Sequence, residues 1–440
     1  MEKTLLENYA KRIAVSESVY SKAHEGATLD NNKKLAVAMV LNNTAKFMNE
    51  AFSNSVGTQR ADLGEWKKFC LNLTTVALPN LIAQELVIVH PMASISGFIT
   101  YVQYTAGTNK GETKQGDIFN DPFRLGKVDV NYTGSAVVEP VELASGEASK
   151  EVTLAWTPVV EGSCAFVAED GTVTPLTPVD GKVTVTASGK VRYMYDNVKI
   201  PQNDLPIVNA EIKSISLIAK ARRVAVYYSQ IAAFQAKTDY GFDLGDQLAE
   251  KAVGQLQYEI DTEITDLLIA NAAKDADLTF NKTLPTGVSK AEHYEGFSEI
   301  VEIGKQKVYD KTKRFAPNYM LIASNILPIL SFIKGWKAAP AGKINGPYFA
   351  GTLNSIKVFV TPNIEAGKFV LGVNGDDMMS SAAVYAPYMA VVPTQLLGYA
   401  DGGMSQGFST MYALEMLNKD LLVAGEVVAA PQTVNVSIAA

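Results

Sequence analysis

A long amphipathic helix is the sequence feature that most constrains the fold of this chain. After a break at Tyr240-Gly241, Asp243 can cap a helix that continues to about Ala273. Its apolar residues recur mostly every four positions and form one continuous stripe: Leu244, Leu248, Ala252, Val253, Leu256, Ile260, Ile264, Leu267 and Leu268. An ordinary core helix is the simplest interpretation, but about 30 helical residues reach on the order of 45 Å. A helix of this length can cross a whole domain.

The segment before this helix has a different period. From Ala210 to Ala221 the apolar residues alternate, with Ile212 and Ile218 on one face and Ile215 and Leu217 on the other. Period 2 predicts a strand that is half or fully buried. We expect a first, shorter helix to follow from about Tyr227 to Lys237.

Composition indicates a folded protein of two or three compact units. The chain has 440 residues, of which 47% are hydrophobic and 19% are charged. Cys70 and Cys164 lie far apart, without metal-binding or redox spacing, so we expect a reducing cytoplasm and no disulfide framework. The N-terminus has no apolar signal region and no 18 apolar residues follow one another, so we expect neither secretion nor a membrane span.

The first 55 residues have a helical pattern. Leu29-Asp30 begins a second helix with a partial apolar face: Leu35, Ala38, Met39, Leu41, Ala45, Phe47 and Met48. A packed helical arm and an extension that faces a scaffold both fit this pattern.

Short strands and a long loop follow. We expect a buried strand at Leu86–Val89 and another at Phe98–Tyr104. Residues 105–134 are rich in Gly, Lys, Asp and Thr, which predicts an extended loop or open hairpin. Because a plain connection is rarely this long, the loop is expected to be functional.

Residues 136–197 predict a small all-β module. Short runs rich in Val and Thr are separated by Gly, Pro and Asp, and Trp156 and Phe166 can form a core of their own. The alternative is that these strands extend one large sheet.

The C-terminal half alternates between strands and helices. We expect a polar connection at 274–290 with a turn at Asn281–Gly287, then a helix at Glu292–Tyr309. A buried strand at Asn318–Ala323 leads into a helix near Ser324-Asn325. The remaining expected strands carry the sequences IKVFVTP, KFVLGVNG and AAVYAPYMAVVP.

An ordered set of short motifs resembles the major capsid proteins of T4-like tailed bacteriophages. The set comprises the PNLIA segment Pro79–Ala83, the pair Pro91-Met92, Gly97 with its following strand, the YAPY sequence 385–388 and the closing strand 406–412. The resemblance covers about Pro79 to Leu414, and residues 136–197 are its main departure. It implies an α+β subunit with the HK97-type capsid fold, in which the long helix is the spine.

The resemblance, together with the residue pattern of 136–197, divides the chain into seven expected parts. These are an N-terminal helical arm (1–60), the start of the core (61–104), an extended loop that lies on a neighbouring subunit (105–135), an inserted β domain (136–197), a peripheral domain with the spine helix (198–315), an axial domain (316–395) and a return to the peripheral domain (396–440).

The function implied is that of a shell subunit. Hexamers and pentamers would assemble in the host cytoplasm into an icosahedral virion shell around double-stranded DNA, with scaffold, portal and vertex or decoration proteins as partners. A net charge of −7 argues against binding by phosphate neutralisation and suits a wall that encloses DNA without sequence-specific contacts. We expect self-association, because the loop and the arm have few uses within one subunit.

The resemblance raises the question of N-terminal processing. In T4-like relatives a protease cuts after a glutamate that has an aliphatic residue two positions earlier. Met48-Asn49-Glu50 is a poor match, so we predict that the arm is retained. Two alternative functions stay open: an encapsulin-like compartment shell, and a non-enzymatic surface-binding protein built on the β module.

No motif indicates catalysis, a cofactor or a metal. His24, His90 and His293 lie in separate contexts, and Asp376-Asp377 is typical of a turn. Residues 398–407 are rich in glycine, but they lack the Lys-Ser/Thr of a phosphate loop and lead into a strand. Arg222-Arg223 is either a solvated charge pair or an inter-subunit contact. We therefore expect a protein that is not an enzyme.

Overall fold

The computed structural model describes residues 2–23, 28–53, 71, 75, 81–126, 131–143, 148–199, 205–340, 346–394 and 396–428. His24, Cys70 and the pair Pro79-Asn80 lie outside the described residues. The chain forms two compact units: unit 1 comprises Met1–Ile99 and Ser216–Ala440, and unit 2 comprises Thr100–Ile215.

A five-stranded sheet forms one layer of unit 1. Its order is β1-β19-β21-β12, with β20 paired to β21. The bounds are Ile88–Val89 (β1), Ala383–Pro393 (β19), Gly403–Met416 (β21), Lys220–Ser229 (β12) and Leu397–Gly398 (β20). Every residue of β19 except Tyr388 is buried, which agrees with the apolar run that the sequence shows there.

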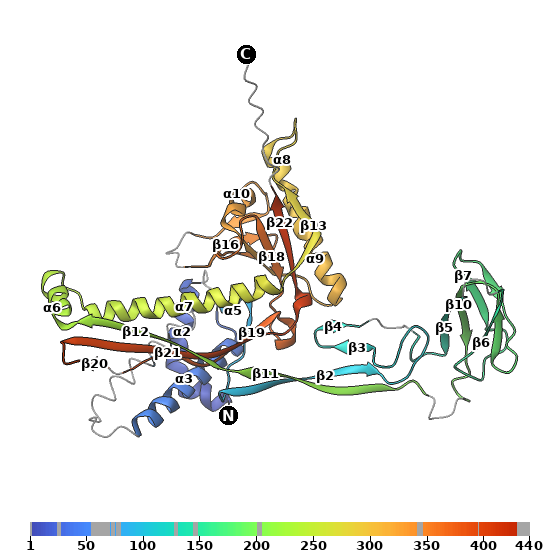
Figure 1. The fold of residues 1–440 in the computed structure, drawn as a ribbon, viewed down its shortest axis with the longest axis horizontal. Coiled ribbons are helices and arrows are strands. Elements are labelled where there is room, and N and C mark those ends of the chain that lie inside the picture. Colours follow the sequence, from blue (N-terminus) through green and yellow to red (C-terminus); the bar gives the residue numbers. More distant parts are fainter. Residues whose placement is uncertain are drawn as a thin grey trace, which may run out of the picture. The chain divides into compact units, whose positions relative to one another are not determined.

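The spine helix α7 (Leu244–Asn271) lies along this sheet, beside β12 and β21 (Figure 1). Asp243 caps it as predicted: its Oδ1 accepts a hydrogen bond from the amide of Gly245 at 2.9 Å. Ala252, Val253 and Leu256 pack against residues of β19 and β21. Farther along, the same stripe enters the main core with Ile260, Ile264 and Leu268. The predicted helix and its buried face are confirmed.

The predicted strand and short helix before the spine need correction. Two strands occupy this region, β11 (Val208–Ile218) and β12, and the helix α6 (Gln230–Asp239) begins three residues later than expected. The Ser229 hydroxyl accepts a hydrogen bond from Ala232 and fixes this start. The predicted burial of the first strand was wrong, because nearly all side chains of β11 are exposed.

A seven-stranded sheet forms the second layer of unit 1. Its order is β13-β22-β18-β14-β17-β16-β15. The bounds are Ala273–Asn281 (β13), Leu422–Val428 (β22), Lys368–Gly372 (β18), Tyr319–Ile322 (β14), Ile356–Val360 (β17), Tyr348–Leu353 (β16) and Trp336–Ala338 (β15). The buried strand predicted at Asn318–Ala323 is β14, and the helical turn predicted after it is present at Ser324–Ile326, continued by α10 (Leu327–Leu330).

The expected polar connection at 274–290 was wrong over its first half. That half is strand β13, which buries only Leu278 and Phe280 and therefore looks polar in sequence. The expected helix 292–309 is two helices, α8 (Lys290–Glu295) and α9 (Phe297–Thr312), separated at Gly296. The domain boundaries predicted at 315 and 395 do not separate the sheets of unit 1. Strands β13 and β22 lie outside the predicted axial domain, yet they belong to the same seven-stranded sheet as the strands inside it.

The N-terminal helices belong to the same packed unit. They are α1 (Glu2–Asn8), α2 (Ala10–Ala23) and α3 (Asn31–Ser53), with the short helix α5 (Ala83–Leu86) farther along. Helix α3 packs on β19, and its residues Val37, Val40, Leu41 and Met48 lie in the main core. The expectation that the arm has few uses within one subunit was therefore wrong.

Unit 2 contains a four-stranded sheet with the order β11-β2-β3-β4. Strand β2 (Ser96–Ala106) contains the predicted strand Phe98–Tyr104, and the segment predicted as a loop carries β3 (Ile118–Asp121) and β4 (Arg124–Leu125). The region is thus closer to the hairpin alternative than to a structureless loop.

The rest of unit 2 is a small β module with two sheets. The order of one is β5-β10-β7-β8, and the other pairs β6 with β9. The bounds are Ala136–Val141 (β5), Lys150–Thr153 (β6), Ala165–Ala168 (β7), Val173–Pro175 (β8), Lys182–Val185 (β9) and Gly189–Met194 (β10). Trp156 and Phe166 are buried in a core that contains only residues of this module, as the sequence predicted.

Candidate functional site: the Glu85 junction and the assembly surfaces

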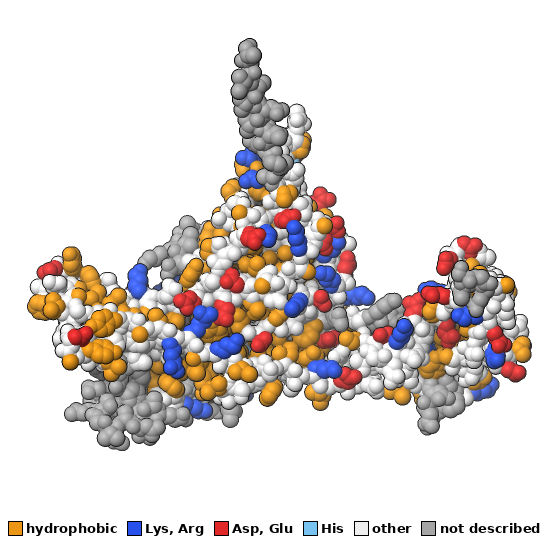
Figure 2. Space-filling view, in the orientation of Figure 1, with side chains coloured by type: hydrophobic (Ala, Val, Ile, Leu, Met, Phe, Trp, Pro, Cys, Tyr) orange, Lys and Arg blue, Asp and Glu red, His pale blue; other side chains and the backbone are white. Residues whose placement is uncertain are grey.

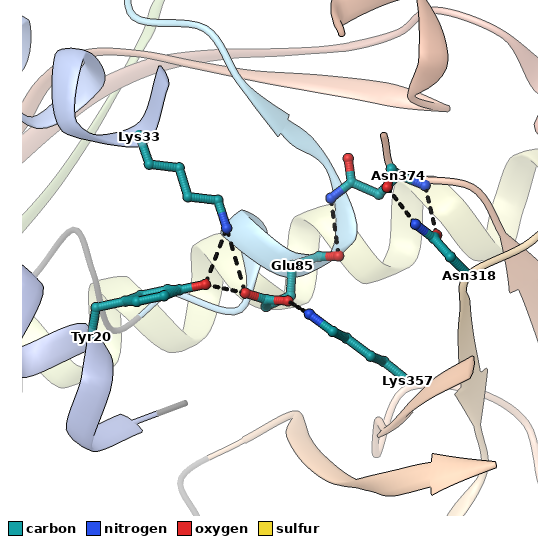
Figure 3. Close-up of polar contacts among 6 residues, drawn as sticks. All are labelled: Tyr20, Lys33, Glu85, Asn318, Lys357 and Asn374. Carbon is teal, nitrogen blue, oxygen red and sulfur yellow. Dashed lines mark hydrogen bonds and ion pairs between the residues drawn. The ribbon is translucent and has the colours of Figure 1, made fainter. Parts of the chain in front are cut away.

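A buried carboxylate joins four elements of unit 1 (Figure 3). The Glu85 side chain on α5 is 8% exposed. Its Oε1 accepts a hydrogen bond from the hydroxyl of Tyr20 on α2 and lies 3.5 Å from Nζ of Lys33 on α3. Its Oε2 accepts a hydrogen bond from Nζ of Lys357 on β17. We call this group of four side chains the Glu85 junction.

Two asparagines extend the junction towards the seven-stranded sheet (Figure 3). Asn374 Nδ2 donates to the backbone oxygen of Glu85 at 3.0 Å. Asn318 accepts from the amide of Asn374 at 2.9 Å and donates to its carbonyl at 2.5 Å. The carboxylate and the backbone of Glu85 are therefore both held from the side of the sheet.

The electrostatics of the junction favour an ionised Glu85. Burial by itself raises the pKa of this carboxyl, but the charge of Lys33 and the hydrogen bonds from Lys357 and Tyr20 outweigh that effect and lower the pKa to about 2. Burial and the bond to Glu85 raise the pKa of Tyr20. The junction is thus a charged, fully bonded group at neutral pH.

A second cluster attaches the spine helix to its sheet. Arg222 on β12 contacts Glu259 at 3.1 Å and Glu263 at 2.7 Å, both on α7. Its Nε donates to the hydroxyl of Tyr412 on β21 at 2.6 Å, and that hydroxyl donates to Glu263. Burial lowers the pKa of Arg222 and the bond to Glu263 raises it, with a net rise. Arg222 therefore has an intramolecular role, while its neighbour Arg223 is exposed.

A buried lysine, which the sequence analysis missed, organises unit 2. Lys110 is 2% exposed, and its ammonium donates to the carbonyls of Asn131, Tyr132 and Gly134 and to the hydroxyl of Tyr195. It also lies over the rings of Trp156 and Tyr195, at 5.3 and 4.8 Å from their centroids. No local pattern signals this arrangement, because the partners lie 21 to 85 residues away in sequence.

His90, His293, the Asp376-Asp377 pair and the glycine-rich segment 398–407, which the sequence offered as possible catalytic or binding positions, do not come together at one place in the structure. His90 follows β1 at the surface, whereas the ring of His293 contacts the carbonyl of Asn281 at 2.8 Å and lies against Phe280. Asp377 caps a short 3₁₀ helix at Met378–Ser380, which confirms the predicted turn. Residues 398–407 comprise the end of β20, a turn at 399–402 and the start of β21, and in the turn Asp401 accepts from Tyr227 and from the amide of Gly403.

Within the ranges that the structure describes, no three acidic, histidine or cysteine side chains lie close enough to hold a metal ion. None of the helices described is long and apolar enough to cross a membrane.

Exposed apolar side chains gather at the α6 end of unit 1 (Figure 2). Ile231, Phe234 and Tyr240 of this region are each more than 70% exposed, and Tyr227 on β12 lies beside Tyr399. A monomer rarely exposes so many large apolar groups together, so this surface is a candidate contact between subunits.

A family model described as "Major capsid protein Gp23" matches residues 63–436. The major capsid protein of Serratia phage KSP90 is 21% identical over 397 residues, which is 85% of this chain and 83% of that relative. The major capsid protein of Enterobacteria phage T4 is 23% identical over 224 residues, which is 44% of this chain and 42% of the relative.

Solved structures show weaker likenesses. A chain of Microbacterium phage Oxtober96 has a TM-score of 0.39 and 12% identity, covering 79% of this chain and 91% of that chain. A virus-like particle from Pyrococcus furiosus has a TM-score of 0.32 and 14% identity, covering 62% and 90%. Likenesses of this size do not by themselves establish a fold. The family match is decisive, because it extends over most of the chain: this chain belongs to the Gp23 family of major capsid proteins.

Proposed function

We propose that the chain forms the hexamers and pentamers of an icosahedral head shell with the HK97-type fold, and that the shell encloses double-stranded DNA. Membership of the Gp23 family makes the chain a subunit of a multi-subunit virion capsid. The observation that carries the proposal is that the family match spans the five-stranded sheet together with the spine helix packed on it.

The finer parts of the proposal rest on the sequence resemblance. We infer assembly in the host cytoplasm, with scaffold, portal and vertex or decoration proteins as partners. The net charge of −7 supports a wall that encloses DNA rather than a protein that binds phosphates tightly. We also infer that the chain has no catalytic role, since its family is one of structural capsid proteins.

Negative-stain microscopy of the purified chain, with light scattering across a range of salt concentrations, tests the proposal. We expect rings or closed shells. A well-folded chain that stays monomeric at high concentration in every salt would contradict it. Shells loaded with an enzyme as cargo would favour the encapsulin-like alternative, against which the phage family match counts.

A further inference from the structure

Besides the connection that α6 and α7 make between β12 and β13, two crossings of the chain connect the two sheets of unit 1, and these crossings lie close together. One crossing connects β18 to β19 over residues 373–382, and another connects β21 to β22 at residues 417–421. The amides of Leu417 and Asn418 both donate to the carbonyl of Ala382, at 2.9 and 3.0 Å. A pair of crossings bonded to each other in this way has the geometry of a hinge between two rigid layers.

The first crossing is also bonded to the segment that carries Glu85. Asn374 holds the backbone of Glu85, and its Oδ1 accepts from the hydroxyl of Ser381 at 2.7 Å. That hydroxyl in turn accepts from the amide of Ile88 on β1 at 3.2 Å. Since β1 pairs with β19, the segment from Glu85 to Val89 touches both sheets.

The N-terminal helices contact both sheets as well. At one end, Tyr20 and Lys33 bind Glu85, which Lys357 ties to the seven-stranded sheet. At the other end, the buried Asn43 of α3 donates to the carbonyl of Tyr388 on β19 at 3.0 Å and to that of Met92 at 2.7 Å. Besides its apolar packing in the main core, helix α3 is therefore bonded directly to β19 and, through Glu85 and Lys357, to the seven-stranded sheet.

We propose that the Glu85 junction is a lock on this hinge: while Glu85 is bonded to Tyr20, Lys33 and Lys357, the N-terminal helices hold the two sheets at one fixed angle. The proposal goes beyond the shell function, because it concerns motion within a single subunit. It assigns a role to helices that precede the matched family segment, which begins at residue 63.

The chemistry of the junction explains why its loss would release the helices. Two ammonium groups converge on one buried carboxylate, and removing that charge leaves them facing each other across a cavity of about 290 Å³. Asp30 and Asp376 also line this cavity, but neither has an ion pair with these lysines. Like charges that lose their shared partner repel each other, so the link that Glu85 makes between the N-terminal helices and the seven-stranded sheet would be broken.

Hydrogen exchange and spin-label distances in the full-length chain test the proposal. The variants are Glu85→Gln and Lys357→Gln, and the control is Glu302→Gln, which removes an exposed ion pair with Lys305 on α9. We expect exchange in α2, α3 and the crossings to accelerate by at least about tenfold in both variants, while β14 keeps its protection. The control should leave all of these rates unchanged.

The distance between the sheets is the decisive measurement. Spin labels at Arg223 on β12 and Lys337 on β15, both exposed, report it in a chain whose Cys70 and Cys164 are replaced by alanine. We expect the distance distribution to broaden by about twofold or more in the two variants. Should exchange accelerate only in α5 and β17 with an unchanged distance distribution, the junction is a local ion pair and the proposal fails. Lys357 is 52% exposed, so we expect Lys357→Gln to fold, and it can be measured even if Glu85→Gln does not fold.

Discussion

Among single residues, those of the apolar stripe on the spine helix α7 allow the sharpest prediction. Leu256 is 2% exposed and packs with Val253, Val391 and Phe408. Leu256→Asp would place a carboxylate without a partner in this apolar contact, and we expect a loss of several kcal/mol, on the order of 3 or more. Urea unfolding of the full-length chain measures it. An unchanged unfolding midpoint would mean that the stripe does not face the sheet.

Glu259→Gln is the matched variant on the same helix. Its carboxylate contacts Arg222, but the side chains are 40% and 32% exposed, and Arg222 keeps its bonds to Glu263 and Tyr412. We expect a loss below about 1 kcal/mol in the same urea experiment, as for most exposed ion pairs. A loss as large as that of Leu256→Asp would show that the Arg222 cluster, and not apolar packing, holds the spine helix to its sheet.

The Glu85 junction predicts a defined dependence of stability on pH. The folded pKa of about 2 lies below the usual 4.5, so Glu85 stabilises the fold fully above about pH 5, and the contribution is lost as pH falls towards 2. We expect the stability difference between the wild type and Glu85→Gln to shrink below pH 4.5, by at most about 1.4 kcal/mol per pH unit. Urea unfolding at several values between pH 7 and 3 measures it. A difference that is constant over this range would contradict the depressed pKa.

Residue roles could be predicted from the sequence where the partners are close in the chain. Asp243 and Asp377 cap helical turns a few residues away, and both were recognised as cap or turn residues. Glu85 and Lys357 are 272 positions apart, and neither stands out in its own segment. The role of Lys110 could not be predicted for the same reason, because its partners are also distant in the sequence. Long-range polar contacts depend on the tertiary fold, so local patterns carry no signal for them.

At the scale of elements, the β module should fold by itself. Val191, Tyr193 and Leu154 join Trp156 and Phe166 in a core that uses only its own residues. We expect residues 136–197, expressed alone, to give a dispersed amide NMR spectrum, although they lose the cover of Lys110. Trp156→Ala is the control, and it should collapse the dispersion because it empties the centre of a small core. A random-coil spectrum for the unaltered module would show that its strands need the rest of unit 2.

Elements were predictable where burial follows one regular period. The four-residue spacing of apolar residues identified the buried face of α7, because a single face of this helix packs against β19 and β21 and then in the main core. In β12, half-buried and exposed side chains alternate up to Ser229, and this period of two was overlooked because a helix follows immediately. β11 and β13 expose most of their side chains, so hydrophobicity indicates their strands poorly.

At the scale of the whole molecule, the packed arm predicts the mature N-terminus. Helix α3 continues through Glu50-Ala51 to Ser53, and its buried face contacts β19 and the main core. A protease needs an extended segment, so cutting there would require α3 to unfold and leave its partners exposed. We expect intact-mass spectrometry of protein from mature particles to show a chain that retains residues 1–50. A chain that begins at Ala51 would contradict the prediction without affecting the family assignment.

The order of elements along the chain was largely predictable, whereas their distribution between the sheets was not. The motifs from Leu81 to Tyr412 occur in the expected sequence, but strands distant in the chain share each sheet. β22 inserts between β13 and β18, and β12 pairs with β21 about 190 residues later. Sequence periodicity contains no information about such pairings, and boundaries drawn along the chain therefore cut across both layers.

The position of β22 between β13 and β18 has a consequence for synthesis on the ribosome. β22 pairs with β13 on one side and β18 on the other, yet it lies almost at the C-terminal end of the described chain. At about 5–20 residues per second, β13 emerges on the order of 10 s before β22 is made. During that interval β13 and the β18 edge of the seven-stranded sheet lack the strand that pairs with both, and these unpaired strand edges can capture other nascent chains. The order of translation thus delays completion of the seven-stranded sheet until β22 has been made, and it makes the polysome a place where a chaperone would matter.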